Sequence, residues 1–449
     1  MSAMAAARRL RVAWRVLRAE GTAAVRDRTQ DRLAEAVRRR SYAPAPPGWR
    51  PEEPIPVLVV AATPPVPWMG GVPTQLRTRL EAEARGRSVA LLYPHGGSWR
   101  LEVRSGAERR FLELPGAPLS PVALEDAAFE EAVRQAAQRI GARAVHVDGL
   151  AGLPPASLLR LVREGRTLLL TLHDFAAFCP RPHLIEEPEH RFCWHSRDLD
   201  RCGNCLGQHW LVDRGFQGER REISAALLGA SRAVVFPSEL LRQLHTELFP
   251  GLATEGWHVL EPPIASTVAW PRQPPGPLRH VAFVGSVQPH KGSRVFLETV
   301  RRLTGEGLRW SAYGGGDAAP LRELRQMGVR VRGYYRSGSL PGLLRRDGVD
   351  LALLLSIWPE SHSLVLSECV VAGVPAVAFA LGALAERIPL LQAGRLVPLE
   401  QGAEGIAAVL REMRRDGPPA VAEESARLLI DPVSAAAGHL ALYRELGLI

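Results

Sequence analysis

Short, almost wholly apolar segments recur along the chain, and segments of helical or loop character separate them. We expect two series of strands, at 56–61, 89–93, 144–147, 167–172 and 233–236 and at 280–284, 309–313, 330–332, 351–355 and 376–379. Continuous apolar strands that alternate with helices indicate a parallel sheet covered on both faces. The pattern therefore predicts an α/β protein with two doubly wound domains.

Proline-rich breaks divide the chain, one at residues 41–56 and another at 261–263 and 271–277. Such breaks mark linkers. We therefore expect four parts: a basic helical arm with its linker at 1–50, a first domain at 51–268, a second domain at 269–430 and a last helix at 431–449. Two such domains leave a cleft at the carboxyl ends of their strands, where ligands bind sheets of this kind.

Basic charge is concentrated at the N-terminus. The chain has 56 Lys and Arg against 47 Asp and Glu, and residues 1–50 alone hold 12 Arg and 4 acids. The remainder is nearly neutral, with 44 basic against 43 acidic residues by subtraction. Proteins that bind nucleic acid more often spread basic residues over a folded face, so we expect no nucleic-acid partner.

Residues 5–40 are expected to form two short arginine-rich helices. Leu10, Trp14 and Leu17 are spaced at i, i+4 and i+7, so they share one helix face with arginines around it. This face suits either an anionic membrane surface or packing on the protein body, and the sequence leaves both open.

Targeting and membrane-spanning signals are weak in this sequence. No apolar core follows the N-terminal arginines, as a secretory signal would require. The longest apolar stretch, 364–384, contains Glu368 and the Gly373-Val374-Pro375 turn. It therefore lacks the run of about 20 apolar residues of a spanning helix. We expect a cytoplasmic protein, at the inner face of the membrane if the arm binds lipid.

Lys291 is the single lysine among the 56 basic residues. It lies in the segment VAFVGSVQPHKG, where Gly285 ends a predicted strand and Lys291-Gly292 precedes a predicted helix. A helix N-terminus favours phosphate through its N–H groups and its dipole. Lysine is a compact point charge that the planar fork of arginine does not reproduce. The sequence therefore indicates a phosphate site around Lys291.

Glu360 and Glu368 lie eight residues apart in the segment WPESHSLVLSECVVAGVPAVAFALGA. We place Glu360 in the loop after the strand 351–355, and Glu368 one turn into a helix that begins near Ser363 and Leu364. The N–H groups of Ser363 and Leu364 then suit a diphosphate. Glu368 suits ribose hydroxyls, and Glu360 suits a sugar.

These segments resemble the retaining nucleotide-sugar glycosyltransferases of the GT-B fold, specifically glycosyltransferase family 4, within the glycosyl transferases group 1. The second half carries the resemblance in GSVQPHKG (285–292), YGGGD (313–317), VRGYY (331–335) and PESHSLVLSECVVAGVP (359–375). The first half agrees through GGVPTQL (70–76) and TLHDF (171–175). The resemblance covers residues 56–446. It implies two Rossmann-like domains that face a cleft, with a final helix, containing Tyr443, that crosses back onto the first domain.

The resemblance also implies roles for individual residues. Lys291 would bind the diphosphate of the sugar donor, Glu360 would lie by the transferred sugar and His173 would line the catalytic cleft. The implied catalytic residues are His173, Lys291 and Glu360, and the implied donor-binding residues are Gly70, Gly71, Gly285, Lys291, Gly333, Ser363, Leu364 and Glu368. His146, at the end of a strand, and Asp174 are expected on the acceptor side.

The implied reaction transfers a sugar from a nucleotide-diphosphate donor to a hydroxyl of a surface-glycan or lipid-linked acceptor, without a catalytic divalent metal. Lys291 and helix N-termini would stabilise the leaving phosphate. Ser286 departs from the family pattern, which often has Arg there, so another Arg must replace the missing charge or diphosphate binding is weaker. Two alternatives are another GT-B enzyme such as a nucleotide-sugar epimerase, and a non-catalytic scaffold that binds sugars or partners.

Four of the five cysteines lie in a predicted insertion at about 176–210: Cys179, Cys193, Cys202 and Cys205. In a cytosolic enzyme such a cluster indicates metal before disulfides, and four thiolates suit structural Zn²⁺. An iron–sulfur cluster and free or oxidised thiols remain alternatives, and a histidine could replace one ligand: His183, His190, His195 or His209. The segment 173–205 resembles a cysteine-containing subset of the same transferases. Cys369 is expected to be a small core residue.

Overall fold

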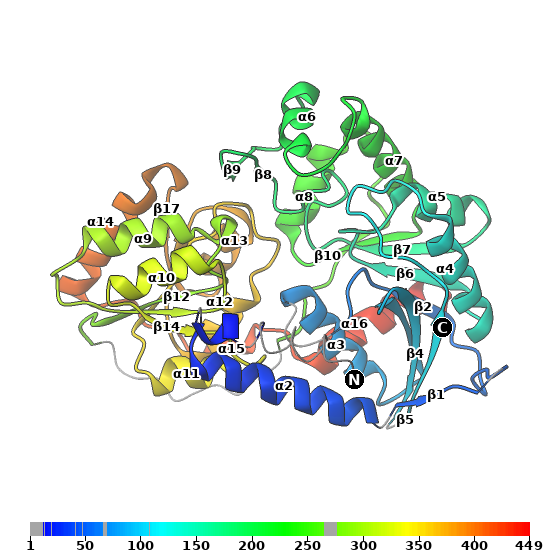
Figure 1. The fold of residues 1–449 in the computed structure, drawn as a ribbon, viewed down its shortest axis with the longest axis horizontal. Helices are drawn as coiled ribbons and strands as arrows, with labels where there is room; N and C mark the ends of the chain where they lie inside the picture. Colours follow the sequence, from blue (N-terminus) through cyan, green and yellow to red (C-terminus); the bar gives the residue numbers. More distant parts are fainter. Residues whose placement is uncertain are drawn as a thin grey trace. The chain divides into compact units, whose positions relative to one another are not determined.

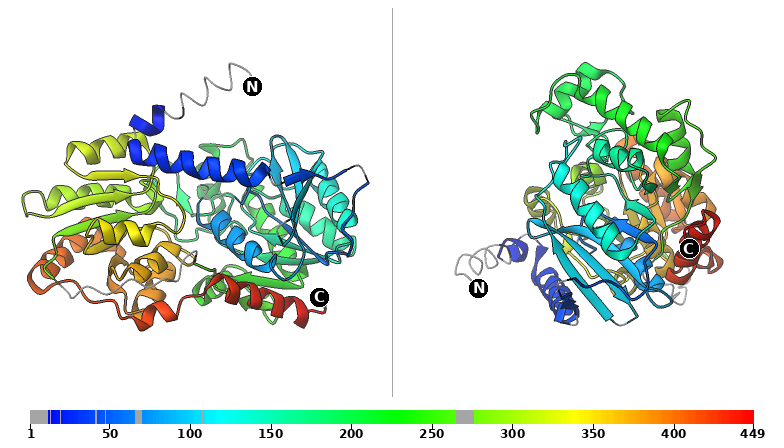
Figure 2. Two further views of the ribbon diagram at one scale, coloured as in Figure 1. Left: turned by 90° about the horizontal axis from the view of Figure 1, so that it is seen from below. Right: turned by 90° about the vertical axis from the view of Figure 1, so that its right-hand side faces the viewer.

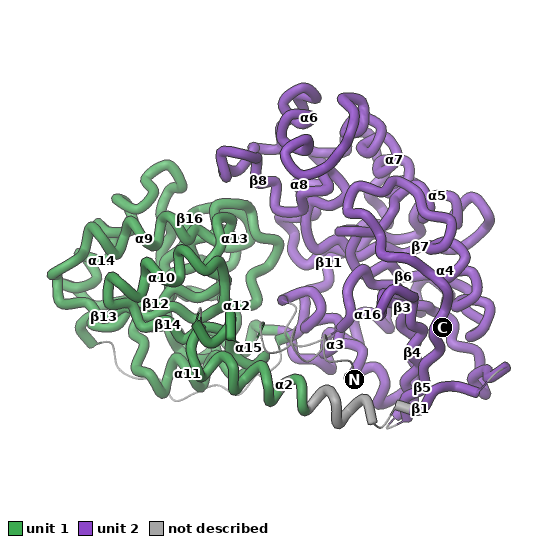
Figure 3. Tube along the Cα trace, viewed as in Figure 1, with its two compact units in different colours: residues 1–35, 264–429 green, residues 36–263, 430–449 purple. Residues whose placement is uncertain are grey.

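The computed structural model describes residues 12, 14–18, 20–40, 42–46, 48–65, 70–106, 108–264 and 276–449. The chain forms two units, residues 1–35 with 264–429 and residues 36–263 with 430–449 (Figures 1 and 3). After the roles that the resemblance implies, the first of these is called the donor unit below, and the second the acceptor unit. The division falls at residue 263, and the last helix belongs to the acceptor unit.

A nine-stranded sheet forms the centre of the acceptor unit, in the order β1-β5-β4-β3-β2-β6-β7-β10-β11. Its strands are β1 (Tyr42–Pro44), β2 (Val57–Val60), β3 (Val89–His95), β4 (Ser98–Ser105), β5 (Glu108–Leu114), β6 (Ala144–Asp148), β7 (Thr167–Thr171), β10 (Ala233–Phe236) and β11 (Trp257–Val259). The five strands predicted in this half are confirmed. These five strands pair parallel, as predicted. The sheet also contains β4, which was not predicted and which pairs antiparallel with both β3 and β5.

The helices of the acceptor unit are α3 (Gly71–Glu83), α4 (Ala127–Ile140), α5 (Pro155–Arg163), α6 (Leu199–Gly207), α7 (Phe216–Ala230), α8 (Glu239–Leu248) and α16 (Pro432–Glu445). A hairpin of β8 (Ile185–Glu186) and β9 (Arg191–Phe192) precedes α6. Figures 1 and 2 show α16 beside α3. Val57, Leu169 and Val235 of the sheet pack with Leu442 and Tyr443 of α16 in one core cluster.

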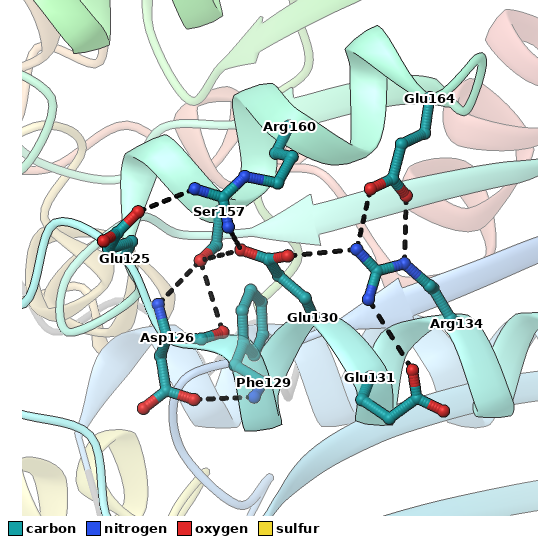
Figure 4. Close-up of polar contacts among 9 residues, drawn as sticks. All are labelled: Glu125, Asp126, Phe129, Glu130, Glu131, Arg134, Ser157, Arg160 and Glu164. Carbon is teal, nitrogen blue, oxygen red and sulfur yellow. Dashed lines mark hydrogen bonds and ion pairs between the residues drawn. The ribbon is translucent and has the colours of Figure 1, made fainter.

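Polar contacts join α4 and α5 at the surface of this unit (Figure 4). Asp126 begins α4, and its carboxylate accepts the N–H of Phe129 over 2.7 Å, which caps the helix. Glu130 of α4 accepts hydrogen bonds from Ser157 and Arg160 of α5, each over 2.8 Å. The buried Glu130 therefore joins α4 to α5.

The donor unit contains a wholly parallel six-stranded sheet in the order β14-β13-β12-β15-β16-β17. The strands are β12 (His280–Val284), β13 (Arg309–Tyr313), β14 (Arg330–Gly333), β15 (Leu351–Leu354), β16 (Ala376–Phe379) and β17 (Gly394–Val397). The five strands predicted in this half are confirmed, and β17 was not predicted. The sheet is therefore of the doubly wound parallel kind that the sequence indicates.

Helices cover both faces of the donor-unit sheet. They are α9 (Ser293–Arg302), α10 (Ala318–Gln326), α11 (Leu340–Arg346), α12 (Leu364–Ala372), α13 (Gly382–Leu390), α14 (Gly402–Asp416) and α15 (Glu424–Arg427), with 3-10 turns η1 (Pro289–Lys291) and η2 (Leu399–Gln401). Ala282 and Val284 of β12 pack with α11, α12 and α13, whereas Val281 and Phe283 pack with α9, α10 and α14. The alternation along β12 thus supplies two cores.

The N-terminal segment contains α2 (Thr22–Arg40). Val16, Glu20, Ala24 and Asp27 are buried at spacings of four, four and three residues, whereas Trp14 is 55% exposed. The segment therefore packs on the protein body, through a face other than the one predicted. Leu10 lies outside the described residues. Among the described helices none is long and apolar enough to cross a membrane, and membrane contact through residues 5–40 stays a prediction.

Candidate active site

Lys291 lies at the end of η1, in the loop that follows β12. Its Nζ donates a hydrogen bond to Oε1 of Glu360 over 2.5 Å and lies 5.8 Å from the centre of the Trp358 ring. The next residue, Gly292, has a φ of +77°, and a Cβ there would lie 1.9 Å from the carbonyl oxygen of Leu355. The glycine therefore lets this loop touch the end of β15, so that Lys291 reaches Glu360.

Glu360 is buried, with 7% of its surface exposed. Burial by itself would raise its pKa, but the charge of Lys291 and hydrogen bonds from Lys291, Ser356 and Ser363 together hold the pKa below its ordinary value. The carboxylate therefore stays ionised at neutral pH and can accept hydrogen bonds from hydroxyl groups. The Lys291 side chain is 27% exposed, so the pair is accessible to a ligand on the lysine side.

Ser363 precedes α12 in a left-handed conformation, with φ 67° and ψ 80°. Such a conformation costs a residue other than glycine about 1–3 kcal/mol. The buried Arg387 holds this turn, since Nη1 donates to the carbonyl oxygens of His362 (2.9 Å) and Ser363 (3.2 Å), and Nη2 to Oγ of Ser367 (3.1 Å). Ser363 gives α12 no side-chain cap. An uncapped helix N-terminus suits an anion.

Glu368 lies one turn into α12. Burial raises the pKa of its carboxyl group to about 7. Both protonation states are therefore populated near neutral pH, and the ionised form can accept hydrogen bonds from hydroxyl groups. The role of Glu368 at the ribose stays a prediction. The neighbouring Cys369 is fully buried in the core, which confirms the expectation for that residue.

The loops after β12 and β13 are joined by their backbones. The N–H of Gly285 donates to the carbonyl of Tyr313 over 2.9 Å, and a Cβ on Gly314 would lie 2.0 Å from the carbonyl oxygen of Gly285. A Cβ on Gly285 itself would meet nothing within 4 Å. Open space beside a glycine at the carboxyl end of a strand fits the predicted donor-binding role of Gly285.

Gly333, at the end of β14, has a different neighbourhood. A Cβ there would lie 2.5 Å from Cβ of Glu20 and 2.9 Å from Cβ of Ala24, and its φ is +70°. The N-terminal segment of the same unit therefore fills the space beside it. The resemblance implies a donor-binding glycine here, and the structure supplies a packing reason for the same residue.

His173 follows β7 in the acceptor unit, and both of its ring nitrogens are engaged. Nδ1 lies 2.8 Å from Nε2 of Gln75, and Nε2 lies 2.5 Å from Oδ1 of Asp148. Since an amide nitrogen only donates, Nδ1 accepts and the Nε2–H group donates to Asp148. His173 is thus held in one tautomer, and a sugar hydroxyl would compete with Gln75 for Nδ1.

Asp148 is the centre of this buried group. It accepts a hydrogen bond from Nη2 of Arg79 over 2.9 Å as well as the one from His173. Although burial opposes the effect, the neighbouring His173 and Arg79 hold the pKa of Asp148 well below its ordinary value. An ionised Asp148 keeps His173 in place, because the hydrogen bond at one ring nitrogen of a histidine fixes the state of the other.

The two residues predicted on the acceptor side have hydrogen-bond partners within this unit, and His146 is buried whereas Asp174 is partly exposed. His146 is 0% exposed, and its Nδ1 lies 2.6 Å from the Tyr443 hydroxyl while Nε2 lies 2.7 Å from Oγ1 of Thr171. Burial lowers its pKa to about 3, so it is neutral. Oδ1 of Asp174 accepts the N–H of Ala176 over 2.9 Å, and burial raises the pKa of this carboxyl. His146 thus links β6, β7 and α16, a position that gives an acceptor no access to its ring.

The remaining predicted donor residues lie at loop ends. Gly70 precedes α3 with φ +106° and open space at its Cβ position, and Gly71 begins that helix, which has no side-chain cap. This is again an uncapped helix N-terminus that a phosphate suits. Leu364 is the first residue of α12. At Ser286, where the family often has Arg, the carbonyl accepts the N–H of Gln288 over 2.8 Å. That another Arg supplies the positive charge absent from this position stays a prediction.

The four clustered cysteines line one cavity together with Arg181, Arg201 and Arg221. The N–H of Glu187 donates to Sγ of Cys205 over 3.4 Å, and Nη2 of Arg221 donates to Sγ of Cys202 over 3.6 Å. Within the ranges that the structure describes, no group of three or more His, Cys, Asp or Glu side chains is arranged to hold a metal ion. The zinc site is therefore not confirmed and stays a prediction.

Three residues of these clusters were not found from the sequence. Gln75 lies within GGVPTQL, a segment matched for its glycines, and Arg79 follows it by one turn of α3. The helical spacing of Gln75 and Arg79 was the signal that could have paired them with the strand ends at Asp148 and His173. Arg387 lies 24 residues from Ser363 in the sequence, and no local pattern connects them.

Part of the chain matches a known protein family. Residues 279–416 match the family model described as glycosyl transferases group 1. Among solved structures, sucrose-phosphate synthase from Thermosynechococcus elongatus is similar, with 15% identity, a TM-score of 0.61 and coverage of 88% of this chain and 99% of that one. Among curated proteins no relative matches.

Two further solved structures are similar. One is Anabaena HepE in complex with UDP-glucose, with 14% identity, a TM-score of 0.55 and coverage of 88% of this chain and 100% of that one. The other is WaaG, a glycosyltransferase involved in lipopolysaccharide biosynthesis, with 14% identity, a TM-score of 0.53 and coverage of 87% and 98%. At such identities these likenesses show the fold.

The fold is that of a GT-B protein, with two α/β units built on mostly parallel sheets. Residues 279–416, which hold Lys291, Glu360 and Glu368, match the model of the glycosyl transferases group 1, and this match supports an enzyme of glycosyl transfer.

Proposed function

We propose that this glycosyltransferase moves a sugar, with retention, from a nucleotide-diphosphate donor to a hydroxyl of a glycan or lipid-linked acceptor. The observation that carries the proposal is the pair of Lys291 and Glu360 beside the uncapped N-terminus of α12, inside the matched domain. This group combines a cation for phosphate, an ionised carboxylate for hydroxyls and helix N–H groups for a second phosphate.

In this reaction the bond between the anomeric carbon and the diphosphate oxygen breaks, and a bond from that carbon to the acceptor oxygen forms on the same face. The acceptor proton passes to the leaving diphosphate. Negative charge builds on the leaving oxygen as its bond breaks, and Lys291 with the N–H groups of α12 stabilises this charge. When Lys291 turns to phosphate it leaves Glu360, which is then available to accept hydrogen bonds from the sugar.

The acceptor unit contributes His173 to the proposal. Asp148 and Gln75 fix its tautomer and orientation, so the ring meets a sugar or an acceptor in one arrangement. Gln75→Leu would free Nδ1 of His173 and remove this control. Fixed orientation of a binding group is worth several kcal/mol where it positions reacting atoms.

The test is release of nucleotide diphosphate from a panel of UDP-, GDP-, ADP- and dTDP-sugars. UDP-glucose comes first, because a similar solved structure, HepE, holds it. We expect slow release from one donor, and a loss of about 100-fold or more in Lys291→Ala and Glu360→Gln, the size typical of removing one electrostatic catalytic group. Analysis of the sugar product separates transfer to an acceptor from epimerisation.

Glu412→Gln is the matched control, because this exposed glutamate in the donor unit pairs with Arg395 far along the chain from the predicted site. Exposed pairs contribute about 0–1 kcal/mol, so the control should release nucleotide as the unchanged protein does. If folded protein neither binds nor cleaves any donor, the transferase proposal is wrong and the scaffold alternative gains support.

A further inference from the structure

The N-terminal segment from Val16 to Arg28 is built into the donor unit. Asp27 forms a buried ion pair with Arg332 of β14, and Arg332 also donates to the carbonyl of Tyr334 over 2.9 Å. Ala24 is fully buried. A buried ion pair is costly to form and strongly destabilising to break, so these residues fix the segment at one place on β14.

Glu20 binds the backbone at the end of the same strand. Its carboxylate accepts the N–H of Tyr334 over 2.9 Å and a hydrogen bond from Nη2 of Arg28 over 2.6 Å. The Arg28 guanidinium lies 5.0 Å from the centre of the Tyr334 ring. Glu20 and Asp27 are two of only four acidic residues in the basic stretch 1–50, and both face the donor unit.

Two glycines of the family motifs accommodate this segment. A Cβ on Gly315 would lie 2.7 Å from Oε2 of Glu20, and a Cβ on Gly333 would lie 2.7 Å from the Glu20 carbonyl oxygen. Side chains at either glycine would therefore push Glu20 away. Gly315 of YGGGD and Gly333 of VRGYY thus both pack against Glu20 of the N-terminal segment.

Backbone hydrogen bonds connect this contact to the loop that carries Lys291. The N–H of Gly314 donates to the carbonyl of Gly333 over 2.9 Å, and the N–H of Val287 donates to the carbonyl of Gly315 over 2.8 Å. The N–H of Lys291 donates to the carbonyl of Gln288 over 3.1 Å. A continuous set of bonded loops therefore runs from Glu20, past the ends of β14 and β13, to the loop after β12.

We propose that the N-terminal segment braces the donor-binding edge of the sheet, with Glu20 and Asp27 as positioning residues for the loop of Lys291. The inference rests on the proposed function in so far as that loop binds the sugar donor. Contiguity alone does not establish energetic coupling, so the test measures coupling directly.

The experiment compares full-length Glu20→Gln and Asp27→Asn with the unchanged protein in hydrogen–deuterium exchange and in binding of UDP, GDP, ADP and dTDP. We expect faster amide exchange at residues 333–335, 314–317 and 285–291, and a dissociation constant for the bound nucleotide about tenfold higher, which corresponds to about 1.4 kcal/mol. Measurements well below the unfolding temperature separate positioning from a general loss of stability.

Glu102→Gln is the matched control. Glu102 is an equally buried carboxylate in the acceptor unit and pairs with Arg104. The variant should lose stability without any change of exchange at 285–291 or of nucleotide affinity. A positioning role therefore changes both the amide exchange at 285–291 and the nucleotide affinity, whereas a merely structural role changes neither.

Three results would overturn the proposal. Tighter nucleotide binding in Glu20→Gln would show that the segment obstructs the site, and unchanged affinity would show that it does not reach it. Faster exchange confined to residues 333–335 would show that the brace ends there. If the unchanged protein binds no nucleotide, the proposed function fails, and exchange at 285–291 still decides whether the segment supports that loop.

Discussion

At the scale of single residues, Lys291 and Glu360 show why one lysine persists in an arginine-rich chain. The Nζ atom is a small donor that fits between the Trp358 ring and a buried carboxylate. A planar guanidinium is larger and binds oxygens in a fork. A lysine can therefore exchange one carboxylate oxygen for a phosphate oxygen by a small rotation of its side chain.

Glu368 predicts a pH dependence of donor binding. Burial raises the pKa of its carboxyl group to about 7, and under the proposed function the ionised form would accept the ribose hydroxyls. Binding should therefore strengthen as pH rises through 7, by about tenfold between pH 6 and pH 8, the change in the ionised fraction. The measurement is the dissociation constant of the nucleotide diphosphate across this pH range.

Glu368→Gln is the control for this prediction, because glutamine keeps the shape but does not titrate. The phosphate groups of the nucleotide also titrate near pH 6, and they do so equally with either protein. The variant should lose the rise attributed to Glu368 and bind more weakly at pH 8. Affinity that falls with pH in the unchanged protein but not in the variant would show that the protonated carboxyl is the binding form.

At the scale of elements, most of the predicted strands could be found because they are runs of buried apolar residues, as in β2 and β15. β4 and β5 were missed for a physical reason. Along β4, Trp99, Leu101 and Val103 are buried and alternate with charged residues, a period-two pattern of antiparallel strands. A search for continuous apolar runs passes over such strands.

The candidate site was predictable only in part. Residues placed by a strand end and the following helix, such as Lys291 and Glu360, lie where the local pattern put them. Arg387 and Glu20 reach the same unit from distant parts of the chain, and only tertiary packing brings them there. His146 shows the limit of a strand-end rule, because a helix from the other end of the chain encloses this histidine.

The cysteine-lined cavity predicts an effect of metal removal. If Cys179, Cys193, Cys202 and Cys205 bind Zn²⁺, purified protein should contain about one zinc per chain, and a chelator should lower the unfolding temperature, since structural zinc contributes directly to folding energy. Nη2 of Arg221 donates to Sγ of Cys202, and the backbone N–H of Glu187 donates to Sγ of Cys205. These hydrogen bonds would stabilise the thiolate forms that bind the metal. The measurement is elemental analysis together with thermal unfolding.

Cys202→Ser should lose the zinc, whereas Cys369→Ala, a cysteine buried in the other unit, should keep it. Iron with acid-labile sulfide in place of zinc would identify a cluster instead. No metal in either protein, with four thiols that react freely in the unfolded chain, would show that the cavity is a thiol pocket without metal.

At the scale of the whole molecule, the two units have separate cores and each includes a distant piece of chain. Residues 430–449 belong to the acceptor unit, and residues 1–35 belong to the donor unit. Both ends of the chain therefore complete a sheet domain that is otherwise built from the middle of the sequence. Each unit should then have its own stability, which ligands and mutations can change separately.

Tyr443→Phe tests this arrangement. The change removes the hydroxyl that bonds Nδ1 of His146 and leaves a buried nitrogen without that partner, at a cost of about 1–3 kcal/mol. In a unit of this size each kcal/mol lowers the unfolding temperature by about 2–4 °C. We expect calorimetry to show this shift in the acceptor unit's transition alone.

Tyr313→Phe is the matching change in the donor unit, where the Tyr313 hydroxyl donates to Asp347 over 2.7 Å. It should lower the other transition. Under the proposed function a nucleotide diphosphate should raise that same transition, because ligand binding stabilises the unit that contains the site. If both tyrosine changes lower a single shared transition, the units unfold as one body. The ends of the chain would then tie the whole molecule together instead of completing two independent domains.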